Sequence, residues 1–412
     1  MLRRFSALLA ALLVAAVPSG AQQPAAATLA ITRANVVDGV TDTRIFNATI
    51  LVRDGRIVSI RAGGPVPAGA TVLDAAGRWI APGMIDVHTH IASLASARRA
   101  IDAGVTTVRS ASVPAFQDVV MRDQARAGQI VAPDILATGV FVTPQLGETI
   151  LADARLGVLA GGVQTPEELK LVVRVNADRG VNWIKTRGTE RAGLPETDPR
   201  QQTYTEAQLR AIVEEATARR IPVMAHAHGD EGAYAAVAAG VRSIEHGTYL
   251  SDSTLQLMRA KGTWLVPTLS TIVDLTTPGG DYDNPVLVLR GQHMAPRIEE
   301  TIRHAHALGV RIAAGADTDY GPSSVTRISH EIIRFVALGM TPLEALTTAT
   351  SGAAELLGVG DRTGRIAVGY EADLILVERD PLLEPSTLQD VLVVVTNGRV
   401  VRNRLPFART DR

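Results

Sequence analysis

The segment MIDVHTH, residues 84–90, places His88 and His90 one residue apart at the end of an apolar run. Alternate side chains of a strand project to the same face, so both imidazoles are expected to point the same way. Such a pair is either two histidines of a core or half of a metal site. The chain has no cysteine, so a metal would be held by His, Asp, Glu or a less usual ligand.

Other polar residues fall at the ends of further apolar runs. They are Lys185 in VNWIKTRG, His226 and His228 in IPVMAHAHGD, His246 in SIEHGTY, and Asp317 in IAAGADTDYG. Lysine is rare in this chain, yet Lys185 lies inside an apolar strand pattern. It is either a buried cation paired with a carboxylate or an amine that burial and a nearby metal render neutral. A neutral amine can add carbon dioxide and form a carbamate that bridges two metal ions.

Residues 83–360 must position these side chains, and they alternate apolar strand-like segments with helical patterns. The strand candidates centre near Ile85, Val105, Ile135, Ile184, Val223, Ile244, Leu265 and Ile312. Glycines suited to end a helix in the left-handed conformation recur before the strands, at Gly104, Gly180, Gly240, Gly262 and Gly309. Eight strands alternating with helices predict an α/β protein with a (β/α)8 TIM barrel. The polar residues would then lie at the C-terminal ends of the strands, where barrel enzymes carry their active sites.

The two ends of the chain differ from this middle. Residues 27–82 and 361–410 read as short strands, punctuated by turns such as Asp54-Gly55 and Asn397-Gly398. We therefore expect one small β-sandwich domain built from both ends. Residues 140–164 and 268–296 are long connections after the third and seventh strands, and they are expected to form a lid or a wall of the substrate site.

Residues 1–21 have the pattern of a signal peptide, with Arg3 and Arg4 before an apolar stretch and a cleavage site after Ala21. The alternative is an uncleaved membrane anchor. The first reading predicts a bacterial periplasmic or secreted protein with no membrane contact after cleavage. The net charge of −1 offers no electrostatic footprint for nucleic acid.

Taken together, the motifs HTH, the lysine of the fourth strand, AHAHG, IEHG and AGAD resemble those of the metal-dependent amidohydrolase superfamily. GRWIAPGMIDVHTH and GRIAVGYEADLILV resemble the segments that join its β-sandwich to its barrel. The sequence is similar to the branch containing prolidase-like carboxypeptidases, imidazolonepropionase-related proteins and ochratoxin-hydrolysing amidases. This resemblance implies two zinc ions bridged by a carboxylated Lys185. It also implies the remaining ligands: His88, His90 and Asp317 for one metal, His226 and His246 for the other.

The mechanism implied by such a site uses a hydroxide shared by two metals, which lower the pKa of water to about 7 and polarise a carbonyl. Asp317 is the expected general base and would pass the proton to the leaving amine. His228 lies on the same face as His226 and is the candidate for binding the substrate carbonyl or the oxyanion. Its alternative role is that of a packing histidine.

Two departures from the family pattern concern the ligand strand and the substrate. Relatives often show AGTD where this chain has AGAD, a change that leaves Asp317 intact. Many prolidase-like members carry Gly-Gly-His-Gly after the third strand, whereas FVTPQLGETI has no histidine. The family's way of binding a substrate carboxylate through this histidine is therefore not expected in this chain.

Weaker site candidates lie near the expected mouth of the barrel. Arg109, at the end of the second strand, binds a substrate carboxylate or pairs with a carboxylate inside the barrel. Tyr204, His293 and His330 lie in or after loops at the mouth and are candidate substrate contacts. Asp86 either orients a ligand imidazole or is a buried structural aspartate.

These features predict an exported hydrolase acting on the amide C–N bond of a small molecule, such as a dipeptide (Xaa-Pro-like) or an N-acyl amino acid. Opening of a cyclic amide, as in imidazolonepropionases or hydantoinases, and lactone hydrolysis are the alternatives. A metal-free binding protein of the envelope would not need the full ligand set. The natural substrate, the metal in the cell and the formation of a homo-oligomer stay open.

Overall fold

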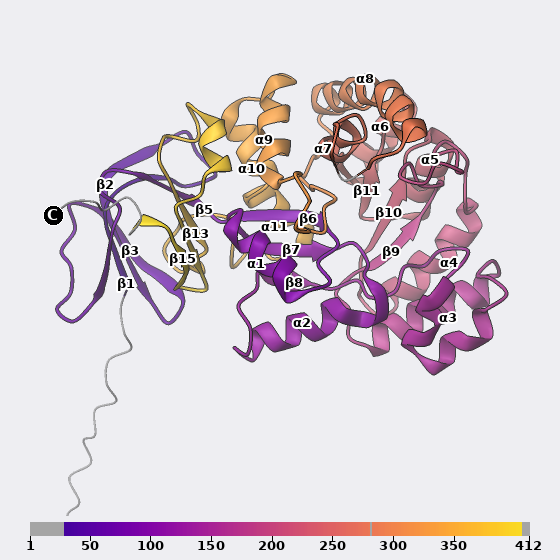
Figure 1. Cartoon of the computed structure of the whole chain (residues 1–412), viewed down its shortest axis with the longest axis horizontal. Helices are drawn as coiled ribbons and strands as arrows, with labels where there is room; N and C mark the ends of the chain where they lie inside the picture. The colour runs from indigo at the N-terminus through magenta and orange to yellow at the C-terminus, as the bar shows by residue number, and fades with distance from the viewer. Residues whose placement is uncertain (1–28, 281, 406–412) are drawn as a thin grey trace, which may run out of the picture.

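Strands from both ends of the chain form one eight-stranded sheet in the computed structural model, which describes residues 29–280 and 282–405. The order is β15-β14-β13-β5-β1-β2-β3, with β4 paired to β1 (Figure 1). Their bounds are β1 Leu29–Val37, β2 Arg44–Arg53, β3 Arg56–Ala62, β4 Thr71–Asp74, β5 Trp79–Pro82, β13 Leu374–Val377, β14 Val393–Thr396 and β15 Arg399–Asn403. The expected signal peptide and its cleavage site lie outside the described residues.

This terminal sheet is a single sheet rather than the two sheets expected for a sandwich. Strand β5 hydrogen-bonds on both sides, parallel to β1 and antiparallel to β13, and so joins the two halves. Ile31, Ile50, Leu374 and Val393 share one apolar cluster, although they come from opposite ends of the chain. The sheet therefore curls over its own core.

The strands of the middle region form two parallel sheets, β6-β7-β8 and β9-β10-β11-β12. Their bounds are β6 Met84–Thr89, β7 Val105–Ser110, β8 Asp134–Leu136, β9 Ile184–Arg187, β10 Val223–Ala227, β11 Ser243–His246 and β12 Trp264–Val266. Seven of the eight expected strands are thus present among the described residues. Strand and helix alternate around them in a TIM-barrel-like arrangement, seen at the right of Figure 1.

The eighth expected strand, near Ile312, is not a strand, and the two sheets do not close into one ladder. The segment makes only isolated bridges, from Ile312 to Leu265 of β12 and from Thr318 to Thr89 of β6. Between β8 and β9 the sheets are likewise joined by a single bridge, from Val142 to Thr186. Asp317 has a φ of 48°, which ends the extended backbone that a ladder requires. The expectation of a closed eight-stranded barrel is therefore wrong for this part of the chain.

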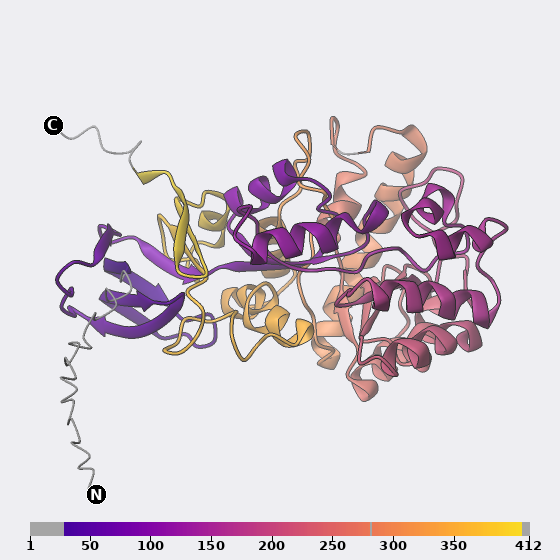
Figure 2. The same cartoon turned by 90° about the horizontal axis from the view of Figure 1, so that it is seen from below.

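Helices cover the outside of the parallel strands (Figures 1 and 2). Their bounds are α1 Leu94–Asp102, α2 Gln117–Arg126, α3 Pro166–Asp178, α4 Glu206–Thr217, α5 Asp230–Ala239, α6 Asp252–Lys261, α7 Leu269–Asp274, α8 Pro285–Leu308, α9 Ile328–Ala337, α10 Pro342–Thr348 and α11 Ser351–Leu357. Gly240, Gly262 and Gly309 end α5, α6 and α8 in the left-handed conformation, as predicted. Among the described residues, no helix combines the length and apolar character needed to cross a membrane.

The two long connections are more ordered than irregular loops. Residues 140–164 contain two 3-10 helices, Gly147–Ala152 and Ala154–Leu159, and the second long connection holds α7 and the start of α8. Leu156 and Leu159 are buried in the main apolar cluster, which fixes the first connection to the barrel. The first connection is thus held against the strands by these buried leucines.

Candidate metal and active site

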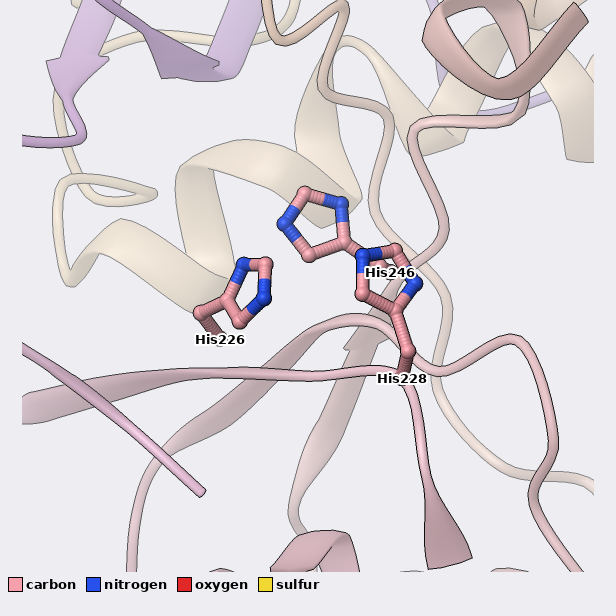
Figure 3. Close-up of side chains that lie close together, drawn as sticks. All are labelled: His226, His228 and His246. Atoms are coloured by element: carbon pink, nitrogen blue, oxygen red, sulfur yellow. The ribbon is translucent and has the colours of Figure 1, made fainter. Parts of the chain in front are cut away.

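The histidines of β10 and β11 meet at the ends of their strands. Ring centroids are 4.9 Å apart for His226 and His228, 4.5 Å for His226 and His246, and 4.6 Å for His228 and His246. The three imidazoles face one another in Figure 3, and each offers a nitrogen within 4.8 Å of the others. His246 has a φ of 74°, which turns its side chain inward at the end of β11. These three side chains could hold a metal ion.

A second group forms around His88 at the end of β6. Its Nε2 lies 3.3 Å from Asp317 Oδ1 and 3.2 Å from Lys185 Nζ. His246 links the two groups, because its Nδ1 lies 3.9 Å from Asp317 Oδ2 and its ring is 5.2 Å from that of His88. His88, His246 and Asp317 likewise bring one ligand atom each within 4.8 Å of the others.

His90 completes the contacts of Asp317. Its Nε2 lies 3.1 Å from Asp317 Oδ1, and its Nδ1 lies 2.8 Å from the carbonyl oxygen of Ser112. A neutral imidazole has one N–H, and both of these neighbours are acceptors. A cation between Nε2 and the carboxylate would satisfy both atoms at once. The donor set therefore fits a metal ion.

Every other histidine of the two groups also has one nitrogen occupied by the protein. Nδ1 of His88 pairs with Glu245, Nδ1 of His228 with Thr248, Nδ1 of His246 with Thr268, and Nε2 of His226 with the carbonyl of Glu190. These partners fix the ring orientations and leave the second nitrogen of each ring directed into the site.

Glu245 is a site residue that the sequence analysis missed. Its Oε2 lies 2.6 Å from His88 Nδ1, and its Oε1 accepts a hydrogen bond of 2.9 Å from Arg109. Strand alternation places Glu245 on the face opposite His246, but the positive φ of His246 breaks this alternation. The available signal was Arg109, because an arginine within an apolar strand requires a buried carboxylate.

Arg109 itself pairs with that carboxylate and does not face substrate. Its side chain is fully buried, donates to the carbonyl of Val87, and lies 4.5 Å from the ring of Trp183. Tyr204 is also fully buried, and its hydroxyl donates to the carbonyl of Val163. The prediction that Arg109 and Tyr204 contact substrate is therefore wrong, because neither side chain is accessible. Both residues hold other parts of the structure in place.

The remaining weak candidates lie on helices of the outer layer. His293 is exposed on α8 with its ring 5.9 Å from that of Tyr249, and His330 is half-buried on α9. Neither has a contact with the histidines or Asp317 among the described residues. Asp86 accepts from the backbone N–H groups of His88 and Ala316, so it fixes two site segments rather than an imidazole.

Burial dominates the electrostatics of the site. It lowers the pKa of His88 to about 4 and that of Lys185 to about 8, because the charged forms lose hydration. For Asp317, burial acts to raise the pKa, but the neighbouring His88 and the hydrogen bond from His90 outweigh it and lower the pKa. The site thus favours neutral imidazoles beside one carboxylate, which is the form in which these groups bind a metal.

Comparison with known proteins agrees with this donor set. The chain matches the model of the Amidohydrolase family over residues 79–401. It belongs to this family. The matched region runs from β5 to β15 and contains all the site residues above.

Named amidohydrolases lie among its relatives. The chain is 30% identical to the ochratoxinase of Aspergillus niger over 284 residues, 64% of this chain and 58% of that protein, so the match leaves over a third of the relative uncovered. It is 26% identical to the imidazolonepropionase of Stenotrophomonas maltophilia over 386 residues, 82% and 87% of the two chains.

The structure is also similar to that of a Xaa-Pro dipeptidase with methionine bound in its active site. The TM-score is 0.81 at 26% identity, covering 92% of this chain and all of that one. These relatives confirm the predicted branch of the Amidohydrolase family.

Proposed function

We propose that this amidohydrolase hydrolyses the amide C–N bond of a dipeptide of Xaa-Pro type or of an N-acyl amino acid, using two divalent metal ions. The observation that supports this most directly is the contact of Lys185 Nζ with His88 Nε2 at 3.2 Å, inside a cluster of neutral imidazoles and one carboxylate. An ammonium group there would repel a metal, whereas a carboxylated lysine would bind one.

The ligand assignment is the one that the family resemblance implies, and it differs from the two groups of side chains by leaving His228 out of the ligand set. His88, His90 and Asp317 would hold one metal, His226 and His246 would hold the other, and a carboxylated Lys185 would supply a ligand shared by both. Zinc suits this set of imidazole nitrogens and carboxylate oxygens without thiolates. When bound, two such ions polarise a carbonyl and provide a nucleophilic water at neutral pH.

The side chains of the chain direct the proton transfers. Asp317 is ionised, since its pKa is lowered, and accepts the proton of the attacking water before passing it to the leaving amine nitrogen. Nδ1 of His228 lies 2.8 Å from Thr248 Oγ1; we assign the hydroxyl as the donor, which keeps the N–H of His228 at Nε2, directed into the site. That N–H stabilises the oxyanion of the tetrahedral intermediate.

Export belongs to the same proposal. Residues 1–21 carry the pattern of a signal peptide, and a chain without cysteine folds unchanged in an oxidising compartment. The working location would be the bacterial periplasm or the medium. Analysis of the N-terminus of the protein recovered from that compartment tests cleavage after Ala21.

A second candidate function is hydrolytic opening of a cyclic amide. The match to an imidazolonepropionase over 386 residues favours it, because a water activated at the same metal ligands can attack a ring amide and an open-chain amide alike. Assaying dipeptides, N-acyl amino acids and cyclic amides in parallel on the zinc-loaded enzyme separates the two.

The replacement Lys185→Ala tests the bridging lysine. Because alanine offers no ligand, the variant should lose at least one of about two metals per chain and nearly all activity, measured by elemental analysis and amide hydrolysis. Added acetate or propionate should restore part of the rate. Lys170, half-buried on α3 and paired with Glu167, gives the matched control: Lys170→Ala should keep both metals. A Lys185→Ala enzyme with both metals and a normal rate would make this lysine a structural cation.

A further inference from the structure

Arg187 lies at the C-terminal end of β9, two residues beyond Lys185, so the two side chains share one face of the strand. Both pack near the ring of Phe141, at 6.0 Å for the Arg187 guanidinium and 5.8 Å for Lys185 Nζ. In the parallel ladder, Arg187 is the register partner of His226. Arg187 therefore stands beside the candidate metal site, one step closer to its mouth.

The guanidinium of Arg187 is buried but only partly satisfied. The residue is 9% exposed and donates from Nη1 to Glu190 Oε2 at 3.0 Å. Its Nε is buried without a hydrogen-bond partner among the described residues. Buried polar atoms are almost always paired, so an orphaned one beside the candidate site indicates a missing partner. Because a guanidinium only donates, that partner must be an acceptor.

A second arginine, Arg191, lies in the segment that follows β9. Arg191 is exposed, and its guanidinium has no hydrogen bond or ion pair within residues 29–280 and 282–405. The residue before it, Glu190, receives the His226 Nε2 contact at its carbonyl oxygen, so Arg191 begins next to a site imidazole. Its charge acts on Lys185, Arg187 and His226.

We infer that Arg187 and Arg191 bind a carboxylate of the substrate, with Phe141 packing against the adjacent apolar group. This rests on the proposed amide hydrolysis and names its substrate class, amides that carry a free carboxylate near the scissile bond. Two arginines and Glu190 leave one net positive charge, which one carboxylate neutralises. Two residues along a strand span roughly 7 Å, so a carboxylate on Arg187 lies a few bonds from a carbonyl held beside Lys185.

The test uses binding without turnover, so that it does not depend on the reaction. L-Methionine and L-methioninol differ in the carboxylate alone, and neither has an amide to cleave. Titration calorimetry on the metal-loaded wild-type enzyme should give a clear preference for L-methionine. Arg187→Gln should weaken its binding roughly 30-fold or more and Arg191→Gln roughly tenfold, since charge-assisted bonds are lost, while methioninol binding stays unchanged.

Arg200→Gln is the matched control. Arg200 is an exposed arginine of the same segment, but it already pairs with Asp198, so its loss should not alter the preference. Elemental analysis of each variant should still show both metals. An unchanged preference for methionine in both Arg187→Gln and Arg191→Gln would overturn the inference. Arginine-dependent methionine binding by an enzyme that cleaves no amide would support the subsite and contradict the proposed function instead.

Discussion

At the scale of single residues, the site is built by partners that occupy one nitrogen of each imidazole. Threonine hydroxyls, backbone carbonyls and the Glu245 carboxylate each take one nitrogen, and the other nitrogen faces the cluster. Among these partners Glu245 fixes its imidazole most firmly, because its own carboxylate accepts a hydrogen bond from the buried Arg109. Arg109, Glu245 and His88 thus form a continuous series of polar contacts from the barrel interior to the site.

Glu245→Gln should weaken metal binding, because a neutral amide no longer holds the His88 tautomer with Nε2 free. Loss of such a partner costs roughly 10- to 100-fold in metal affinity. Competition with a chelator, read by elemental analysis, measures it. Asp373→Asn is the control: this carboxyl is also buried, but it directly precedes β13 of the terminal sheet and accepts hydrogen bonds from Thr363 and Asn397. Equal metal affinities in the two variants would contradict a role for Glu245.

At the scale of elements, strand periodicity and helix-end glycines predicted seven strands and the helix caps correctly. Periodicity failed where the backbone leaves the extended conformation, at His246 and Asp317, both with positive φ. At His246 the positive φ breaks the strand alternation, so Glu245 was not expected in the site. At Asp317 it interrupts the segment that was expected to be the eighth strand. No local pattern encodes such a φ at a residue other than glycine, because tertiary contacts of the site impose it.

The end of β9 depends on a close contact that only glycine permits. A Cβ on Gly188 would lie 2.3 Å from the carbonyl oxygen of Gly232 in α5. Gly188→Ala should therefore push β9 away from α5 and lower the free energy of unfolding by about 1–3 kcal/mol. Urea unfolding measures this.

Gly161→Ala is the control for that variant, because a Cβ there meets no atom within 4 Å. It should change stability by less than about 0.5 kcal/mol. Since Arg187 directly precedes Gly188, the Gly188→Ala enzyme should also bind L-methionine more weakly. Equal stability of the two alanine variants would show that β9 and α5 can separate without cost.

At the scale of the whole molecule, folding gathers many titratable groups into one buried site. Burial lowers the pKa of His88 to about 4 and that of His228 to about 3, and it holds those of two further histidines, His226 and His246, well below 6.5. In the unfolded chain these imidazoles take up protons below about pH 6.5. Unfolding therefore binds protons in acid, and stability falls as the pH drops from about 6.5 toward 4.

Two buried carboxyls act in the opposite direction without cancelling this loss. Burial raises the pKa values of Asp86 and Glu331 to about 7, so the folded protein keeps protons there that the unfolded chain releases. Among the groups with large shifts, four imidazoles against two carboxyls leave about two protons taken up on unfolding near pH 5.5; the smaller shifts of the pKa values of His330, lowered, and Asp373, raised, oppose each other. The metal-free protein should thus lose roughly 2–3 kcal/mol of stability per pH unit there. Urea unfolding at pH 7, 6 and 5 measures the slope. His228→Asn should reduce the slope by the contribution of about one proton, and an identical slope in the wild-type protein and this variant would exclude the His228 imidazole as a cause.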